Sequence, residues 1–75
     1  YNYIILEIEP TDSRVEVHVL YDGDDKGTCV GKIEGGKTKA VCEFDGMRKV
    51  AAIYMVKSKP GLAKIVRFVL IDQVD

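Results

Sequence analysis

The residues of this chain best suited to chemistry are its two cysteines, Cys29 and Cys42, which flank the glycine pair Gly35-Gly36. Such a pair accommodates the positive φ angles of a tight hairpin turn. With the turn centred there, Cys29 and Cys42 lie directly opposite each other on the core face. A two-residue turn makes them a non-hydrogen-bonded pair with Cα atoms roughly 4.5 Å apart, whereas a four-residue loop over 34–37 places them at a hydrogen-bonded site, where the fit is poorer. A disulfide can bridge that distance. The spacing therefore predicts a Cys29–Cys42 disulfide; the alternative is two buried reduced thiols that act as small core hydrophobes.

The predicted disulfide bears on stability and on location. A chain of 75 residues has a small core, and closing this loop would add about 3 kcal/mol in the chain-entropy account. Disulfides persist in oxidising compartments, so we expect an extracytoplasmic protein, either secreted or held at the cell surface. A structural zinc site needs four ligands, which two cysteines and the distant His18 do not supply. We therefore expect no metal site and no cofactor.

His18, the one histidine of the chain, is the candidate for a general base. It falls on the polar face of an alternating segment, beside Arg14 and Glu16. A general base needs a positioned partner and a pocket, and the sequence indicates neither, so an exposed histidine is expected. Ser13 and Ser58 fall in turns without a nucleophile motif around them. We predict no catalytic residues and no enzymatic activity.

The acidic segment 22–27 resembles the start of a calcium-binding EF-hand loop, with Asp22 and Asp24 at ligand spacing. However, Lys26 stands where that loop needs an oxygen ligand, and Ile33 stands where it needs a bidentate glutamate. A solvated acidic loop is therefore expected. A looser calcium site built from Asp22, Asp24 and Asp25 is the alternative.

The elements that must position these residues read as strands. Segments alternate between apolar and polar residues, as is typical of strands buried on one face, and the turns between them are rich in Gly, Pro, Asp and Ser. The density of Val, Ile, Tyr and Phe favours strands in the last third as well. A helix within 46–73 is the alternative there, because part of that region also fits helical spacing. The predicted strands are Asn2–Glu9, Arg14–Tyr21, Thr28–Glu34, Lys37–Phe44, Val50–Lys57 and Ala63–Val74.

The register of the predicted Gly35-Gly36 hairpin sorts its two strands onto two faces. Val30 lies opposite Val41, and Lys32 lies opposite Lys39, an unfavourable pairing of like charges. The core face collects Cys29, Gly31, Ile33, Thr38, Ala40, Cys42 and Phe44.

Composition indicates a single globular domain over residues 1–75, with 47% hydrophobic and 31% charged residues. No apolar run approaches the roughly 20 residues of a membrane-spanning helix. The chain begins at Tyr1 rather than Met, as expected of a processed form or an excised piece. The first 25 residues are acidic and residues 26–67 are basic, so we expect acidic strands to lie beside basic ones.

The segment 65–71 is apolar on both faces except at Arg67. A small two-layer domain has few places to cover both faces of a strand, so part of this segment is expected to meet a partner. Cover by neighbouring long side chains such as Lys57 or Lys64 is the alternative. The candidate interaction surface consists of Ile65, Arg67, Val69 and Ile71.

The order of strands and turns in the middle of the chain resembles immunoglobulin-like sandwich modules of bacterial and archaeal surface proteins. That order is the strand Val15–Tyr21, the turn Asp22-Gly23, a short strand ending at Ile33, the turn Gly35-Gly36 and a strand through Val41. The resemblance implies a β-sandwich. The chain departs from antibody-type domains in having no Trp, and its cysteines are too close in sequence for their inter-sheet disulfide.

Together these features predict a small antiparallel, immunoglobulin-like β-sandwich of about six strands, with a small open β-barrel or an α+β fold as alternatives. The expected function is that of a non-catalytic protein-interaction or structural module, with a protein partner or self-association. The alternative is a β-barrel that binds single-stranded nucleic acid by basic residues and aromatic stacking. Its contact residues would be Lys37, Lys39, Arg48, Lys49, Lys57, Lys59, Lys64 and Arg67 with Tyr54 and Phe68. An isoelectric point near 5.8 makes nucleic acid the less expected partner.

Overall fold

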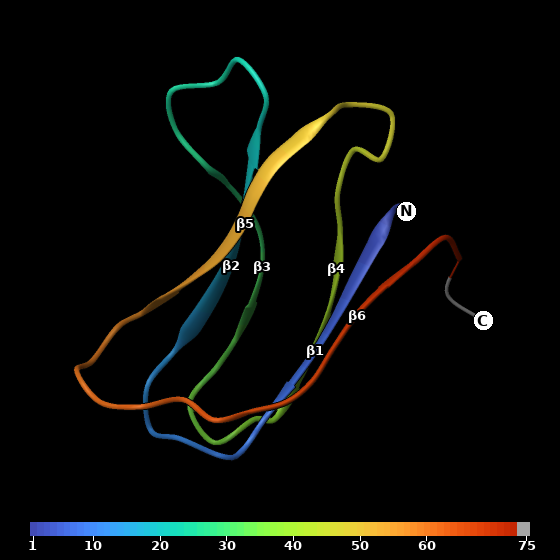
Figure 1. Cartoon of the computed structure of the whole chain (residues 1–75). Helices are drawn as coiled ribbons and strands as arrows, with labels where there is room; N and C mark the ends of the chain where they lie inside the picture. Colours follow the sequence, from blue (N-terminus) through green and yellow to red (C-terminus); the bar gives the residue numbers. More distant parts are fainter. Residues whose placement is uncertain (74–75) are drawn as a thin grey trace.

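The computed structural model describes residues 1–73, which form two antiparallel sheets that stand face to face (Figure 1). Sheet A has the strand order β4-β1-β6 and sheet B has the order β3-β2-β5. No helix occurs within residues 1–73. The all-β prediction is therefore confirmed, with six strands in a small sandwich. The strands are β1 (Tyr3–Ile8), β2 (Val15–Tyr21), β3 (Thr28–Ile33), β4 (Lys39–Glu43), β5 (Val50–Lys57) and β6 (Ile65–Ile71).

The core lies between the two central strands, β1 and β2. Their side chains alternate strictly between buried and half-buried, because in a strand successive side chains point to opposite faces. The chain measures only 15 Å across its thinnest dimension, as expected for two stacked sheets roughly 10 Å apart. The buried hydrophobic residues are Ile4, Leu6 and Ile8 of β1, Val15, Val17, Val19 and Tyr21 of β2, Ile33 of β3 and Cys42 of β4.

The two lateral sides of the sandwich differ. On one side β3 and β4 pack against each other, and Ile33 and Cys42 are buried there. On the other side lie β5 and β6, the remaining edge strand of each sheet, whose residues are exposed or half-buried along their whole length. We call this the β5–β6 side. The sandwich is closed along one side and open along the other.

The predicted hairpin at Gly35-Gly36 is wrong in its strand pairing. The turn itself forms, with Gly36 at a φ of 84° and the Lys37 amide donating to the Glu34 carbonyl at 3.0 Å. However, β3 pairs with β2 and β4 pairs with β1, so the turn carries the chain from one sheet to the other. Strands joined in this way face each other across the core, whereas strands of a hairpin pair edge to edge within one sheet.

The new pairing also removes the predicted clash of like charges. Lys32 lies beside Glu16, and Lys39 lies beside Glu7. The expectation that acidic strands lie beside basic ones is thus met on both sheets.

The last third of the chain forms strands β5 and β6, so the helical alternative within 46–73 is wrong. Val74, the last residue of the final predicted strand, lies outside the described residues. Over residues 1–73, the structure contains no helix long and apolar enough to cross a membrane.

Candidate functional site

Three residues of the predicted interaction surface lie together on the outer face of sheet A. Arg67, Val69 and Ile71 pair with alternate residues of β1 that point away from the core. The register shifts between Glu7 and Ile8, and beyond this irregularity Ile65 pairs with the buried Ile8. Ile65 therefore lies on the inner side of the sheet, 45% exposed.

The outer face of sheet A carries an apolar row that crosses all three strands. Ile5 on β1 lies between Val41 on β4 and Val69 on β6. The next row is charged, since Glu7 lies beside Arg67, and the Arg67 Nη1 is 3.8 Å from the Glu7 Oε1. This face is a mixed apolar and ionic surface.

The β5–β6 side gathers most of the exposed apolar surface of the domain. The cause is the edge position of these strands. Phe68, for example, lies opposite Leu6 on the inner side of sheet A, yet its side chain is 42% exposed because β6 is an edge strand. A hollow between the sheets reaches this side and is lined by Val50 and Ile53 of β5 and Leu70 of β6. The exposed large apolar side chains on the two strands are Tyr54, Met55, Val56, Ile65, Val66 and Phe68.

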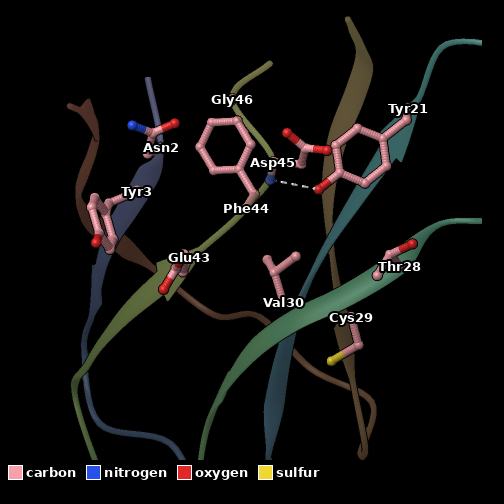
Figure 2. A pocket seen from close by; sticks show the side chains of 10 residues that line it. All are labelled: Asn2, Tyr3, Tyr21, Thr28, Cys29, Val30, Glu43, Phe44, Asp45 and Gly46. Atoms are coloured by element: carbon pink, nitrogen blue, oxygen red, sulfur yellow. Dashed lines mark hydrogen bonds between the residues drawn. The ribbon is translucent and has the colours of Figure 1, made fainter. Parts of the chain in front are cut away.

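A second group of residues, absent from the predicted surface, lies on the outer face of sheet B. His18 on β2 pairs with Cys29 on β3, after a register shift between Val17 and His18. In an unbroken register Cys29 would lie opposite the buried Val19 and point into the core. The shift gives β3 one extra residue, Val30, which packs against the core. Bulges re-aim side chains in this way, and Figure 2 shows Cys29 and Val30 leaving β3 in different directions.

Glu16 holds the imidazole of His18 by a hydrogen bond. The His18 Nε2 donates to the Glu16 Oε1 at 3.0 Å, and the Arg14 guanidinium lies 3.3 Å from the Glu16 Oε2. The hydrogen bond from His18 lowers the pKa of the Glu16 carboxyl, partial burial opposes this effect, and the charge of Arg14 reinforces it. Glu16 is therefore ionised across the neutral range, and it fixes which ring nitrogen of His18 carries a proton.

The expectation of an exposed His18 is wrong, because β5 covers its ring. The Tyr54 ring stacks on the imidazole with centroids 5.2 Å apart and planes 15° apart. A Cβ on Gly27 would overlap the Tyr54 hydroxyl, so this position of the Tyr54 ring requires a glycine at residue 27. Only 17% of the His18 side chain is exposed. Its Nδ1 is buried and has no hydrogen-bond partner.

One ligand atom from each of Glu16, His18 and Cys29 lies within 4.8 Å of the other two. Sequence reasoning missed this group because it followed strict alternation and placed Cys29 on the core face. Gly31 was the available signal, since a glycine inside a strand often marks a bulge.

The predicted Cys29–Cys42 disulfide is wrong in this structure, where both thiols are free. Cys29 points outward from sheet B, whereas Cys42 pairs with Ile4 in sheet A and is buried in the core. Burial raises the pKa of the Cys42 thiol, with a smaller contribution from Cys29. The cysteine pair therefore no longer supports an extracytoplasmic location, which stays a prediction.

The acidic loop after β2 forms an ion pair with the side chain of Arg48. The Arg48 guanidinium lies 3.1 Å from the Asp24 Oδ1 and stacks over the Tyr21 ring, 4.4 Å from its centroid. Asp22 and Asp25 are exposed to solvent. This arrangement matches the expected solvated loop, and the charge of Arg48 opposes the looser calcium site.

An open hollow lies at one end of the β3–β4 side (Figure 2). The Tyr21 hydroxyl, at its edge, accepts a hydrogen bond from the Asp45 amide at 2.9 Å. Phe44 and Val30, which pack against the core, form part of its lining. These contacts connect the end of β2 to the segment after β4, which is a structural role.

Half of the eight basic residues proposed for nucleic-acid binding form ion pairs with carboxylates. Arg67 pairs with Glu7, and Tyr54 and Phe68 belong to different sheets. A channel for single strands combines a continuous basic groove with neighbouring aromatic platforms, and this arrangement differs from it. The other ion pairs of these basic residues are Arg48–Asp24, Lys59–Asp12 and Lys64–Glu9.

Comparison with known proteins found no family model, no curated protein and no solved structure that matches the chain.

Proposed function

We propose that this domain is a non-catalytic protein-interaction module that associates through the β5–β6 side. The observation that carries the proposal is strand β6, whose residues Ile65, Val66 and Phe68 are each at least 42% exposed at an open sheet edge. Exposed apolar patches of this kind, bordered by polar residues, mark association surfaces in soluble proteins.

The free edge of β6 adds backbone groups to the apolar surface. Natural edge strands are protected by proline, by free charges, by β-bulges or by short length. The register irregularity of β6 lies at its first residues, between Ile65 and Arg67, and the run from Arg67 to Ile71 pairs regularly with β1. Strand β6 has seven residues and no proline, and its one charged side chain, Arg67, already pairs with Glu7. Such an edge is suited to the addition of another strand.

The partner that we propose is a second copy of the chain. An antiparallel pair of β6 strands centred on Phe68 would place Arg67 of each copy opposite Val69 of the other, so no like charges would face each other. Such a pair is self-complementary, as a two-fold interface requires.

The test is the molar mass of the chain by sedimentation equilibrium over micromolar to millimolar concentrations. We expect a concentration-dependent dimer that Val66→Lys weakens by about tenfold or more, because a lysine on an edge strand opposes strand addition. Val66 is 61% exposed, so the substitution leaves the core intact. Val41→Lys is the matched control, since Val41 is 47% exposed on the edge strand β4. A chain that stays monomeric, or equal weakening by both substitutions, would contradict the proposal.

The nucleic-acid alternative gains no support from the positions of the basic residues. It makes a separate prediction, namely binding to single-stranded oligonucleotides that weakens steeply with salt. The location outside the cytoplasm and the likeness to immunoglobulin-like modules stay predictions from the sequence.

A further inference from the structure

Three donors of different chemistry converge on the outer face of sheet B: the Glu16 carboxylate, the His18 imidazole and the Cys29 thiol. Zn²⁺ binds all three donor types, at roughly 2.0–2.3 Å each, which separates ligand atoms by roughly 3.3–3.6 Å around a tetrahedral ion. The Glu16 and His18 atoms are already 3.0 Å apart. Cys29 is exposed, so rotation of its side chain can bring the sulfur within range.

The His18 nitrogen that can share an ion with Glu16 is the Nε2, which already lies 3.0 Å from the Glu16 Oε1. The two nitrogen lone pairs of an imidazole diverge, so the Nδ1 cannot bind the same ion as Glu16. When an ion binds the Nε2, the hydrogen bond to Glu16 is broken and the ring proton moves to the Nδ1. In the metal-free chain the Nδ1 is shielded from solvent and has no hydrogen-bond partner.

The strands around Glu16, His18 and Cys29 fix the positions of these three residues. Glu16 and His18 are on the central strand β2, and the bulge in β3 turns Cys29 outward to meet them. Tyr54 holds the imidazole plane from the opposite neighbour, β5. Bulges are enriched beside functional sites because they aim a side chain that strict alternation would direct elsewhere.

We propose that Glu16, His18 and Cys29 bind a Zn²⁺ ion on the outer face of sheet B, with one oxygen, one nitrogen and one sulfur ligand and with water in the fourth position. The Cys29 thiol gives its proton to solvent when the ion binds, because the thiolate is the ligand form. The site does not depend on the association proposed above, since none of its three ligand residues belongs to β5 or β6.

The test uses Co²⁺ as a spectroscopic probe for the zinc site, followed by displacement with Zn²⁺. In the reduced wild-type chain we expect a sulfur-to-cobalt charge-transfer band and the visible bands of four-coordinate Co²⁺, both abolished by Zn²⁺. Cys29→Ser should remove the charge-transfer band, and His18→Gln and Glu16→Gln should weaken binding by at least the roughly 10–100-fold that loss of an outer-shell partner causes. Circular dichroism confirms that each variant is folded.

Matched controls separate this site from adventitious binding. Cys42→Ala keeps Cys29 and should keep the charge-transfer band, and Glu34→Gln removes an exposed carboxylate elsewhere on the surface and should not change the affinity. A band that survives Cys29→Ser, or Co²⁺ affinity equal in wild type and all three ligand variants, would overturn the proposal. Repeating the titration in Val66→Lys keeps the result separate from self-association.

Discussion

The two cysteines show how far one inserted residue can change the chemistry of a strand. Cys42 is 1% exposed and packs against Gly31. A Cβ added to Gly31 would overlap the Cys42 sulfur and lie 3.1 Å from the Cys42 Cβ. Cys29 stands two residues before Gly31, but the bulge turns it to the opposite face. The two thiols of one chain therefore meet different surroundings, one buried and apolar, the other open to solvent.

This difference predicts unequal reactivity of the two thiols. In the native, metal-free chain, iodoacetamide should modify Cys29 at least tenfold faster than Cys42, because the thiolate is the reactive form and burial raises the pKa of Cys42. Because the pKa of Cys42 is raised by burial, its modification should accelerate only at pH values above the ordinary range of a thiol. Peptide mass spectrometry after timed quenching measures both rates.

The same experiment decides between free thiols and the disulfide that the sequence predicts. If both cysteines resist alkylation until a reductant is added, the two are bridged and the strand pairing described here is wrong. Denatured, reduced protein is the control, in which both cysteines should react at similar rates.

Residue-level alternation in the central strands was predictable from the sequence, and the bulge was not. The inward residues of β1 and β2 are those that the alternation indicates, for instance Leu6 and Val17. Alternation also places Ile33 and Cys42 correctly in the core. It fails at Cys29 and Val30, because a bulge reverses the faces on one side of the insertion. The Glu16–His18–Cys29 group depends on that reversal, and so it could not be found by alternation alone.

At the scale of elements, two serines fasten the connection after β1 to the connection after β5. Ser13 is 3% exposed, and its Oγ accepts a hydrogen bond from the Lys59 amide at 3.1 Å. In return, the Arg14 amide donates to the Ser58 Oγ at 2.9 Å. The two hydroxyls are 3.4 Å apart. These reciprocal contacts hold the start of β2 in register with the end of β5. The sequence alone indicated only that both serines lie in turns.

We therefore predict that Ser58→Ala lowers the free energy of unfolding by about 1 kcal/mol. Ser13→Ala should lower it by about 1–3 kcal/mol, because the buried Ser13 hydroxyl contacts the Lys59 amide, the Arg14 carbonyl and the Ser58 hydroxyl. The double variant should lose less than the sum, since the two side chains form one network. Urea denaturation measures each value, and Thr38→Ala, at an exposed position in a connection, is the control. Strictly additive losses would show that the serines act independently.

The pairing of elements was harder to predict than their existence. Strands and turns follow from local composition, and all six predicted strands overlap the observed ones. Local turn chemistry at Gly35-Gly36 is the same whether the flanking strands pair within one sheet or face each other across two. The choice is made by the whole sandwich, in which β1 and β2 take the central positions and bury their inner faces against each other.

At the scale of the whole molecule, the closed β3–β4 side contributes buried residues to the core, and the open β5–β6 side is the proposed association surface. The central strands β1 and β2 have hydrogen-bonded neighbours on both edges, whereas β5 and β6 have one each. The buried residues belong to β1–β4, with Ser13 in the first connection. Local opening should therefore begin on the β5–β6 side, where few buried apolar contacts oppose it.

Hydrogen–deuterium exchange read by NMR tests this division residue by residue. In dilute protein, we expect the amides of β1 and β2 to exchange slowest and those facing outward from the edges of β5 and β6 to exchange fastest. Raising the protein concentration should slow exchange in β6 specifically, because strand addition would engage its free amides. The unpaired edge of β4 is the internal control and should not change. If exchange slows evenly over all strands, or only in β4, the association surface lies elsewhere. If exchange slows only in β6, the association surface lies on the strand whose apolar residues are exposed.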